Sequence, residues 1–215
     1  MSDNIKITLP DSSVQVFPKG SSPYDVALSI SKGLADNALV AEVNGNLVDL
    51  KQPLNEDCLL KLVTYKSPEA QNILLHSTAH VMAHAVQRLF KDVKVTIGPA
   101  IENRFYYDFD APNPFTEEDL QRIEEEMKKI IGEDLPVSRR EVTRDEAIRF
   151  FDQLGETYKV EIIREIPENE ILTIYSQGEW SDLCRGPHIP STGKIKAFKL
   201  LSVAGAYWRG DERNK

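Results

Sequence analysis

The sequence predicts an α+β protein of two domains, a small β-rich one over residues 1–64 and a larger α+β one over residues 65–215. Short segments in which apolar and polar residues alternate dominate the first part, as expected of half-buried strands. Helical spacing of apolar residues, interrupted by turn-rich stretches, dominates the second part, as expected where helices pack on a sheet.

The first domain begins with the alternating segments IKITLP and VQVFP, which the turn-prone run DSS separates. A helix is predicted from Pro23 to about Ser31, because Ser22 is a favoured N-cap and proline suits the first helical position. The segments ALVAEV and LVDL flank Asn44 and Gly45, and Asn-Gly is the strongest short hairpin signal. With CLLKLVTY as a last, buried strand, this order predicts a β-grasp, ubiquitin-like fold.

The second domain is predicted to open, after a short linker, with a long helix over about residues 69–90. Residues 105–110, FYYDFD, are predicted to form a strand. Two further helices are predicted after Thr116 and Thr143, because an acidic residue three positions later completes a capping box at each. From Tyr158 onward, short strands and turns rich in glycine and proline are expected.

Composition limits the classes of function. The formal net charge of −8 argues against nonspecific coating of nucleic acid, which needs clustered Lys and Arg. Acidic residues crowd residues 116–134, however, and basic residues gather in the last third, so RNA binding stays open. Two cysteines, Cys58 and Cys184, make a poor disulfide framework and favour a cytoplasmic location. No signal peptide and no apolar run of the roughly 20 residues that span a bilayer is recognisable, so no membrane contact is expected.

All four histidines fall in two motifs. His76, His80 and His84 lie in LLHSTAHVMAHA, and His188 ends DLCRGPH, four residues after Cys184. On a helix four residues advance about 400°, so the first three histidines share one face. Two such spacings, widely separated in the chain, indicate one site assembled from two places.

The second motif cannot lie within a helix, because Gly186 and Pro187 interrupt it. A tight loop would present Cys184 and His188 to the histidine face. By spacing alone, two histidines from a helix with a cysteine and a histidine from a loop match tetrahedral zinc ligation. The same residues also suit a metal-free hydrolase, in which a histidine with a near-neutral pKa activates water. Cys184 is a further candidate, as a nucleophile with His188 as its base.

Other candidate side chains have competing structural explanations. Lys159 or Arg185 could offset negative charge, and Asp182 could hold an ammonium group. A lysine such as Lys159 on a strand more often faces solvent, and Tyr106 and Tyr107 more often pack in a core.

Five segments in this order closely resemble the N-terminal region of bacterial threonyl-tRNA synthetases: HSTAHVMAHA, IGPAIENRFYYDFD, ETYKVEII, DLCRGPH and AGAYWRGDERNK. The resemblance covers essentially the whole chain. It implies a TGS domain of β-grasp fold over residues 1–64 and an editing domain, related to that of alanyl-tRNA synthetase, over residues 65–215. In the family a class II catalytic core and an anticodon-binding domain would follow, so no ATP-dependent aminoacylation is expected of this chain. The full-length protein is expected to dimerise through that core.

The resemblance also implies a proofreading reaction, the hydrolysis of the ester by which serine, in place of threonine, is attached to the 3′ end of tRNA(Thr). Carried over by motif position, His76 and Lys159 would act on the water or on the developing tetrahedral charge. The remaining motif residues would bind the substrate: His80, Tyr107, Asp182, Cys184 and His188. His84 would lie behind them.

Metal use differs within the resemblance. The alanyl enzymes bind zinc at the matching ligands, whereas the threonyl editing pocket works without metal, so no cofactor is expected for editing. Zinc at His76, His80, Cys184 and His188 is the alternative, and ATP and zinc would belong to the catalytic core. Two other functions stay open: an RNA-binding accessory module without activity when detached, and a zinc-dependent hydrolase of another substrate.

Overall fold

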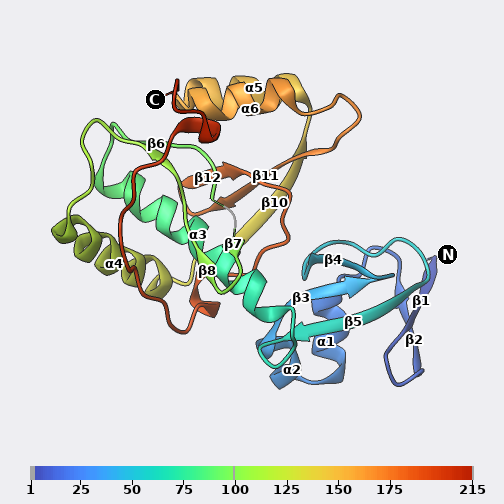
Figure 1. Cartoon of the computed structure of the whole chain (residues 1–215). Coiled ribbons are helices and arrows are strands. Elements are labelled where there is room, and N and C mark those ends of the chain that lie inside the picture. Colours follow the sequence, from blue (N-terminus) through green and yellow to red (C-terminus); the bar gives the residue numbers. More distant parts are fainter. Residues whose placement is uncertain (1–2, 99, 215) are drawn as a thin grey trace.

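The computed structural model describes residues 3–98 and 100–214. Its first domain holds a five-stranded sheet of order β2-β1-β5-β3-β4, in which β1 and β5 run parallel and the other neighbours antiparallel. Figure 1 shows the two short helices lying together against this sheet. The elements are β1 Asn4–Thr8, β2 Val14–Pro18, α1 Pro23–Ile30, α2 Lys32–Asn37, β3 Ala38–Val43, β4 Asn46–Asp49 and β5 Cys58–Thr64. The predicted β-grasp fold is confirmed.

Local chemistry explains these elements. Strand β1 buries Ile5 and Ile7 and exposes Asn4 and Lys6, which is the alternation predicted from the sequence. Ser22 caps α1, as predicted, and also forms a reciprocal capping box with Asp25. The β3–β4 hairpin turns through Asn44 and Gly45, both with positive φ. Helix α2 was not predicted.

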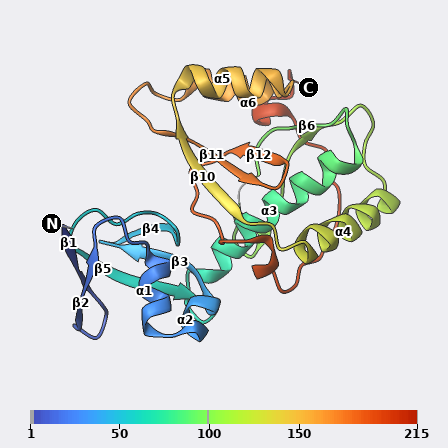
Figure 2. The same ribbon diagram turned by 180° about the vertical axis from the view of Figure 1, so that it is seen from behind.

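The second domain is built around one long helix, α3, which a three-stranded antiparallel sheet of order β10-β11-β12 faces. Helix α4 packs along α3, and α5 and α6 lie together beyond the sheet (Figure 2). The elements are α3 Ala70–Leu89, β6 Lys94–Val95, β7 Ala100–Ile101, β8 Arg104–Phe105, β9 Phe109–Asp110, α4 Glu117–Gly132, β10 Val137–Val142, α5 Arg144–Gln153, α6 Thr157–Glu165, β11 Leu172–Gln177, β12 Trp180–Leu183 and the 3-10 turns Thr192–Lys194 and Trp208–Gly210.

The second domain differs from prediction in several places. The strand expected over residues 105–110 is two short strands, β8 and β9, with residues 106–108 irregular between them. Strand β10 was not predicted. Residues 157–165 form the helix α6, not a strand, because burial follows a helical spacing at Glu156, Lys159, Val160 and Ile163. The helices expected from residue 69, Thr116 and Thr143 are all present.

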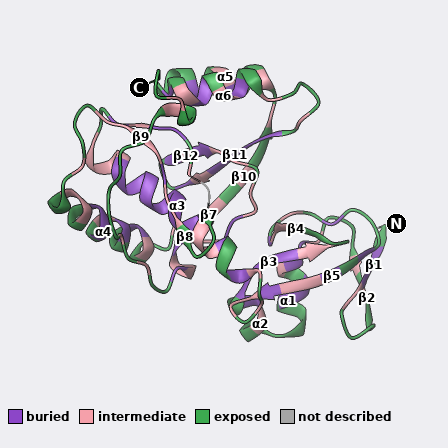
Figure 3. Cartoon of the chain, viewed as in Figure 1, coloured by how far each residue is buried: buried purple, intermediate pink, exposed green. Residues whose placement is uncertain are grey.

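The two domains pack against each other. Leu39, Val40 and Val63 of the first domain join the same apolar core as Ala70 and Ile73 of α3. Figure 3 shows buried stretches in β3 and along the body of α3. The division of the chain at residue 64 therefore stays a prediction, although β5 ends there. None of the helices within the described residues has the length and apolarity needed to cross a membrane.

Candidate active site

Helix α3 carries the three histidines on the side that faces the sheet and the loop after β12. His80 and His84 are buried, and His76 is partly exposed. Because they are four residues apart on a regular helix, they form one inward stripe, as the sequence predicted.

The loop after β12 brings the second motif to this stripe. Gly186 has a φ of +71°, and a Cβ there would lie 1.8 Å from the Tyr175 hydroxyl, so glycine alone lets the loop close against Tyr175. The closure places Cys184 Sγ 3.3 Å from His76 Nε2 and 3.3 Å from His188 Nε2.

His80 completes a compact cluster with His76, Cys184 and His188. Their nearest ligand atoms all lie within 4.8 Å of one another. The rings of His80 and His188 are 4.2 Å apart between centroids. Ser77 Oγ lies 3.1 Å from His188 Nδ1 and thereby orients this ring so that Nε2 faces the thiol. The structure thus brings together the helix and loop motifs, whereas Ser77 carried no signal in the sequence.

His84 lies behind the cluster. Its Nε2 is 3.0 Å from Glu179 Oε1, and its Nδ1 is 3.3 Å from the Gln177 amide nitrogen. Gln177 also donates to the His80 carbonyl at 3.3 Å, so it joins the two histidine positions. Its role was not predicted, because no local pattern connects it to α3.

A second polar cluster adjoins the histidines. Lys159 Nζ lies 2.5 Å from Asp182 Oδ1 and 2.9 Å from the Tyr107 hydroxyl, which donates to Asp182 Oδ2 at 2.6 Å. All three side chains are buried, with 2–7% of each residue exposed. His80 Nε2 lies 3.7 Å from Asp182 Oδ2 and links the two clusters. The alternative of a solvent-facing Lys159 on a strand is therefore wrong.

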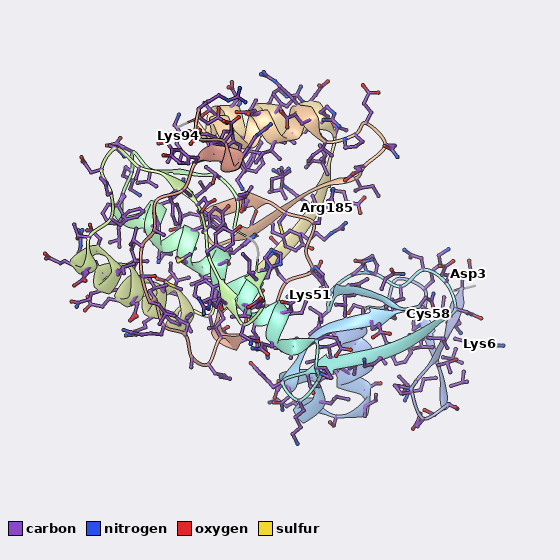
Figure 4. All side chains as sticks on the ribbon, in the orientation of Figure 1. Asp3, Lys6, Lys51, Cys58, Lys94 and Arg185 are labelled. Atoms are coloured by element: carbon purple, nitrogen blue, oxygen red, sulfur yellow. The ribbon has the colours of Figure 1, made fainter. Side chains whose placement is uncertain are left out.

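Two of the other candidates lie elsewhere. The side chain of Arg185 is 79% exposed and pairs with Glu170 at the surface (Figure 4). Tyr106 lines a cavity on the other side of α3.

Comparisons with known proteins match this geometry. Residues 5–64 match the TGS domain family, and residues 172–215 match the family described as threonyl and alanyl tRNA synthetase second additional domain. The chain resembles the N-terminal region of threonine–tRNA ligases over its whole length. It is 56% identical to the Anoxybacillus flavithermus enzyme and 54% to that of Geobacillus kaustophilus, over 100% of this chain in both. It is 56% identical to the Acetivibrio thermocellus enzyme over 98% of this chain. The chain spans 33% of the length of each of these relatives.

Burial sets the protonation states of the three histidines and the cysteine in this cluster. It holds the pKa of His80 and His188 well below the usual value and lowers that of His76, which the charge of Asp182 partly opposes. These imidazoles are therefore neutral near pH 7. Burial also raises the pKa of Cys184 to about 12, so this residue is a thiol and a poor nucleophile there.

The cluster in the second domain has the donors that suit zinc, three imidazole nitrogens and one sulfur at mutually short distances. Ser77, which contacts the free nitrogen of His188, resembles the outer partners that orient metal-bound histidines. The residues fit the metal. A zinc ion held by all four would have its tetrahedral positions filled by protein, which is the arrangement of structural zinc and leaves no position for water.

A large cavity adjoins the site at Tyr107 but does not include the histidine cluster. It measures about 1220 Å³ and lies between the opposite face of α3, residues 103–111 and residues 195–208. Tyr107 lines it, but His76 and Cys184 do not. The polar clusters, not the size of the cavity, therefore define the candidate site.

Proposed function

We propose that this site hydrolyses the ester of serine wrongly attached to tRNA(Thr), the proofreading step of a threonine–tRNA ligase. One observation carries the proposal: neutral imidazoles lie directly beside a buried lysine–carboxylate–tyrosine cluster, in a chain similar to threonine–tRNA ligases. A base and a positive charge within one site are the two parts that ester hydrolysis needs.

Such a site is needed because serine and threonine are difficult to discriminate by binding alone. Serine differs from threonine by one missing methyl group, and a binding pocket distinguishes one methylene-sized group by only about 1–3 kcal/mol. A second pocket that accepts serine but clashes with the threonine methyl corrects the remaining errors.

His76 and Lys159 are the proposed catalytic residues. The imidazole of His76 is neutral and partly exposed, so it can take a proton from water as the oxygen attacks the ester carbonyl. Lys159 offsets the negative charge of the tetrahedral intermediate. As the acyl C–O bond to the ribose breaks, His76 returns the proton to the leaving oxygen.

The other residues of the site hold the substrate. Asp182 would bind the serine ammonium, and Tyr107 the serine or the terminal ribose. A carboxylate offers about four acceptor positions. In the described structure three of those of Asp182 are taken, by Lys159, Tyr107 and the backbone N–H of Leu183, so one remains for the ammonium. His80, Cys184 and His188 form the wall that faces His76.

The proposed reaction needs no metal. Zinc at the cluster would occupy the nitrogen of His76 that the reaction uses as a base, and it would convert Cys184 to a thiolate. We therefore expect added zinc to inhibit hydrolysis and a chelator to leave it unchanged.

The test is deacylation of seryl-tRNA(Thr) and threonyl-tRNA(Thr), with and without a chelator. The expected result is serine-selective hydrolysis that resists the chelator and falls at least roughly 100-fold in His76→Ala and Lys159→Ala. Lys94→Ala is the matched control, because Lys94 lies on the same domain and its Nζ contacts only Thr157 Oγ1, at 3.3 Å, among the described hydrogen bonds. Circular dichroism confirms that each variant is folded at the assay temperature.

Other outcomes would favour the alternatives. Hydrolysis lost on chelation and restored by zinc would indicate a zinc-dependent hydrolase. Binding of tRNA without hydrolysis at high enzyme concentration would indicate an RNA-binding module.

A further inference from the structure

One carboxylate of the TGS domain reaches into the second domain. Asp49 is the last residue of β4, and its Oδ1 accepts the backbone N–H of His188 at 2.9 Å. Its Oδ2 accepts the hydroxyl of Tyr175 at 2.7 Å. Arg139 Nε lies 4.0 Å from the same oxygen. Figure 4 labels Lys51, two residues further on, at the edge of the TGS domain that faces the second domain.

These two hydrogen bonds act on the loop that carries Cys184 and His188. The ring of Tyr175 packs edge-on against the ring of His188, with centroids 4.6 Å apart. Its hydroxyl lies where a side chain of residue 186 would be. Asp49 therefore fixes the His188 backbone directly and the His188 ring through Tyr175.

The β-grasp fold does not itself need this carboxylate. The backbone of Asp49 pairs with Val40 in the sheet, and the neighbouring Leu50 fills the apolar core. The side chain is 17% exposed and points to partners in the second domain, and burial raises its pKa. A carboxylate that loses water in this way needs hydrogen-bond donors, and the second domain supplies them.

We infer that Asp49 is a positioning residue, through which the TGS domain holds the Cys184–His188 loop against His76 and so forms part of the hydrolytic site. The expected change in kcat rests on the proposed function, whereas the positioning of the loop by Asp49 does not. Loss of the carboxylate frees the loop, and the wall of the site then moves away from His76. Such a displacement lowers kcat more than it raises KM.

The experiment compares Asp49→Ala, Asp49→Asn and Tyr175→Phe in the whole chain. For seryl-tRNA(Thr) deacylation we expect kcat to fall at least roughly tenfold in Asp49→Ala with little change in KM. Asp49→Asn should recover part of the loss, because its amide oxygen still accepts the His188 N–H. Asp49→Asn and Tyr175→Phe should be non-additive, since both change the hydrogen bond between residues 49 and 175. Asp57→Asn is the control, because Asp57 lies in the same domain and accepts only the Lys6 N–H among the described hydrogen bonds.

A second readout does not depend on activity. The backbone amide proton of His188 should move upfield in the NMR spectrum of Asp49→Ala, since it loses a charged acceptor, and stay in place in Asp57→Asn. The inference would be overturned if the wild type is active and Asp49→Ala has the same kcat, or if the His188 amide signal does not move. Inactive wild type with a moved His188 amide would refute the proposed function and leave the positioning role supported. If Asp49→Ala does not fold, the same criteria apply to Asp49→Asn and Tyr175→Phe.

Discussion

The two domains differ in where they place polar side chains, which are mostly exposed in the TGS domain and often buried in the second domain. The TGS domain closes around an apolar core, and within its described residues Ser22 is the one polar residue that is buried. Its ion pairs, such as Lys61 with Glu42, lie at the surface. The second domain buries Lys159, Asp182 and three histidines. Burying charge costs stability unless the partners are in place, and buried ionisable clusters of this kind are enriched at functional sites.

The sharpest test of this contrast removes one lysine from each domain. Lys159→Met leaves the Asp182 carboxylate buried without its ammonium partner, and breaking a buried pair in this way costs about 3–5 kcal/mol. Lys61→Met removes the partner of Glu42 and Glu69, where the lysine side chain is 41% exposed, and should cost far less, because solvent screens an exposed pair. Urea unfolding measures both free energies.

A double variant separates charge from packing at the same position. Lys159→Met combined with Asp182→Asn should recover part of the lost stability, because no uncompensated carboxylate remains. Equal losses in Lys61→Met and Lys159→Met would contradict the contrast between the domains.

A pair of glycines gives the next largest effect. A Cβ on Gly98 would lie 2.1 Å from the Tyr107 ring, so Gly98→Ala must displace Tyr107 or the backbone, at a cost of about 1–3 kcal/mol. Gly33 in α2 has no atom near its Cβ position, and Gly33→Ala should stabilise the chain by about 0.4–1 kcal/mol. Thermal unfolding gives the two signs, and deacylation should fall in Gly98→Ala alone. A neutral Gly98→Ala would show that Tyr107 is free to move.

The same contrast explains what could be predicted from the sequence. Capping at Ser22, Thr116 and Thr143 is a local interaction, so the helices that follow these residues were predicted. Helix α6 was missed, because Glu156 makes no side-chain cap and Tyr158, Val160 and Ile162 alternate like a strand.

Within the site, the four-residue spacings of the histidines and of Cys184 with His188 made their convergence predictable. The contacts of Asp49, Ser77 and Gln177 were not predictable, because tertiary packing alone brings these residues to the histidines. Asp49 and His188 are 139 positions apart, and no periodicity acts over such a distance.

The last expected effect is a pH dependence that acts mainly on the second domain. All four histidines lie there, and burial lowers the pKa of each, so the folded chain favours the neutral imidazoles. Their contribution to stability is complete above the unfolded pKa of about 6.5 and is lost as the pH falls below it. Each tenfold difference in proton affinity costs about 1.4 kcal/mol. Burial raises the pKa of Asp49 and Glu156 and opposes this loss, but it does so at lower pH.

Tryptophan fluorescence separates the two domains in this experiment, because both tryptophans, Trp180 and Trp208, lie in the second domain. Between about pH 7.5 and pH 5.5 the urea midpoint followed by fluorescence should fall. Hydrogen exchange at the Leu60 amide in the TGS core should change less, since that core contains no histidine and its stability depends on apolar burial. Equal losses at both probes would show that the two domains unfold as one unit. The apolar core that Val40 and Val63 share with α3 would then couple the domains so strongly that titration of the histidines destabilises both.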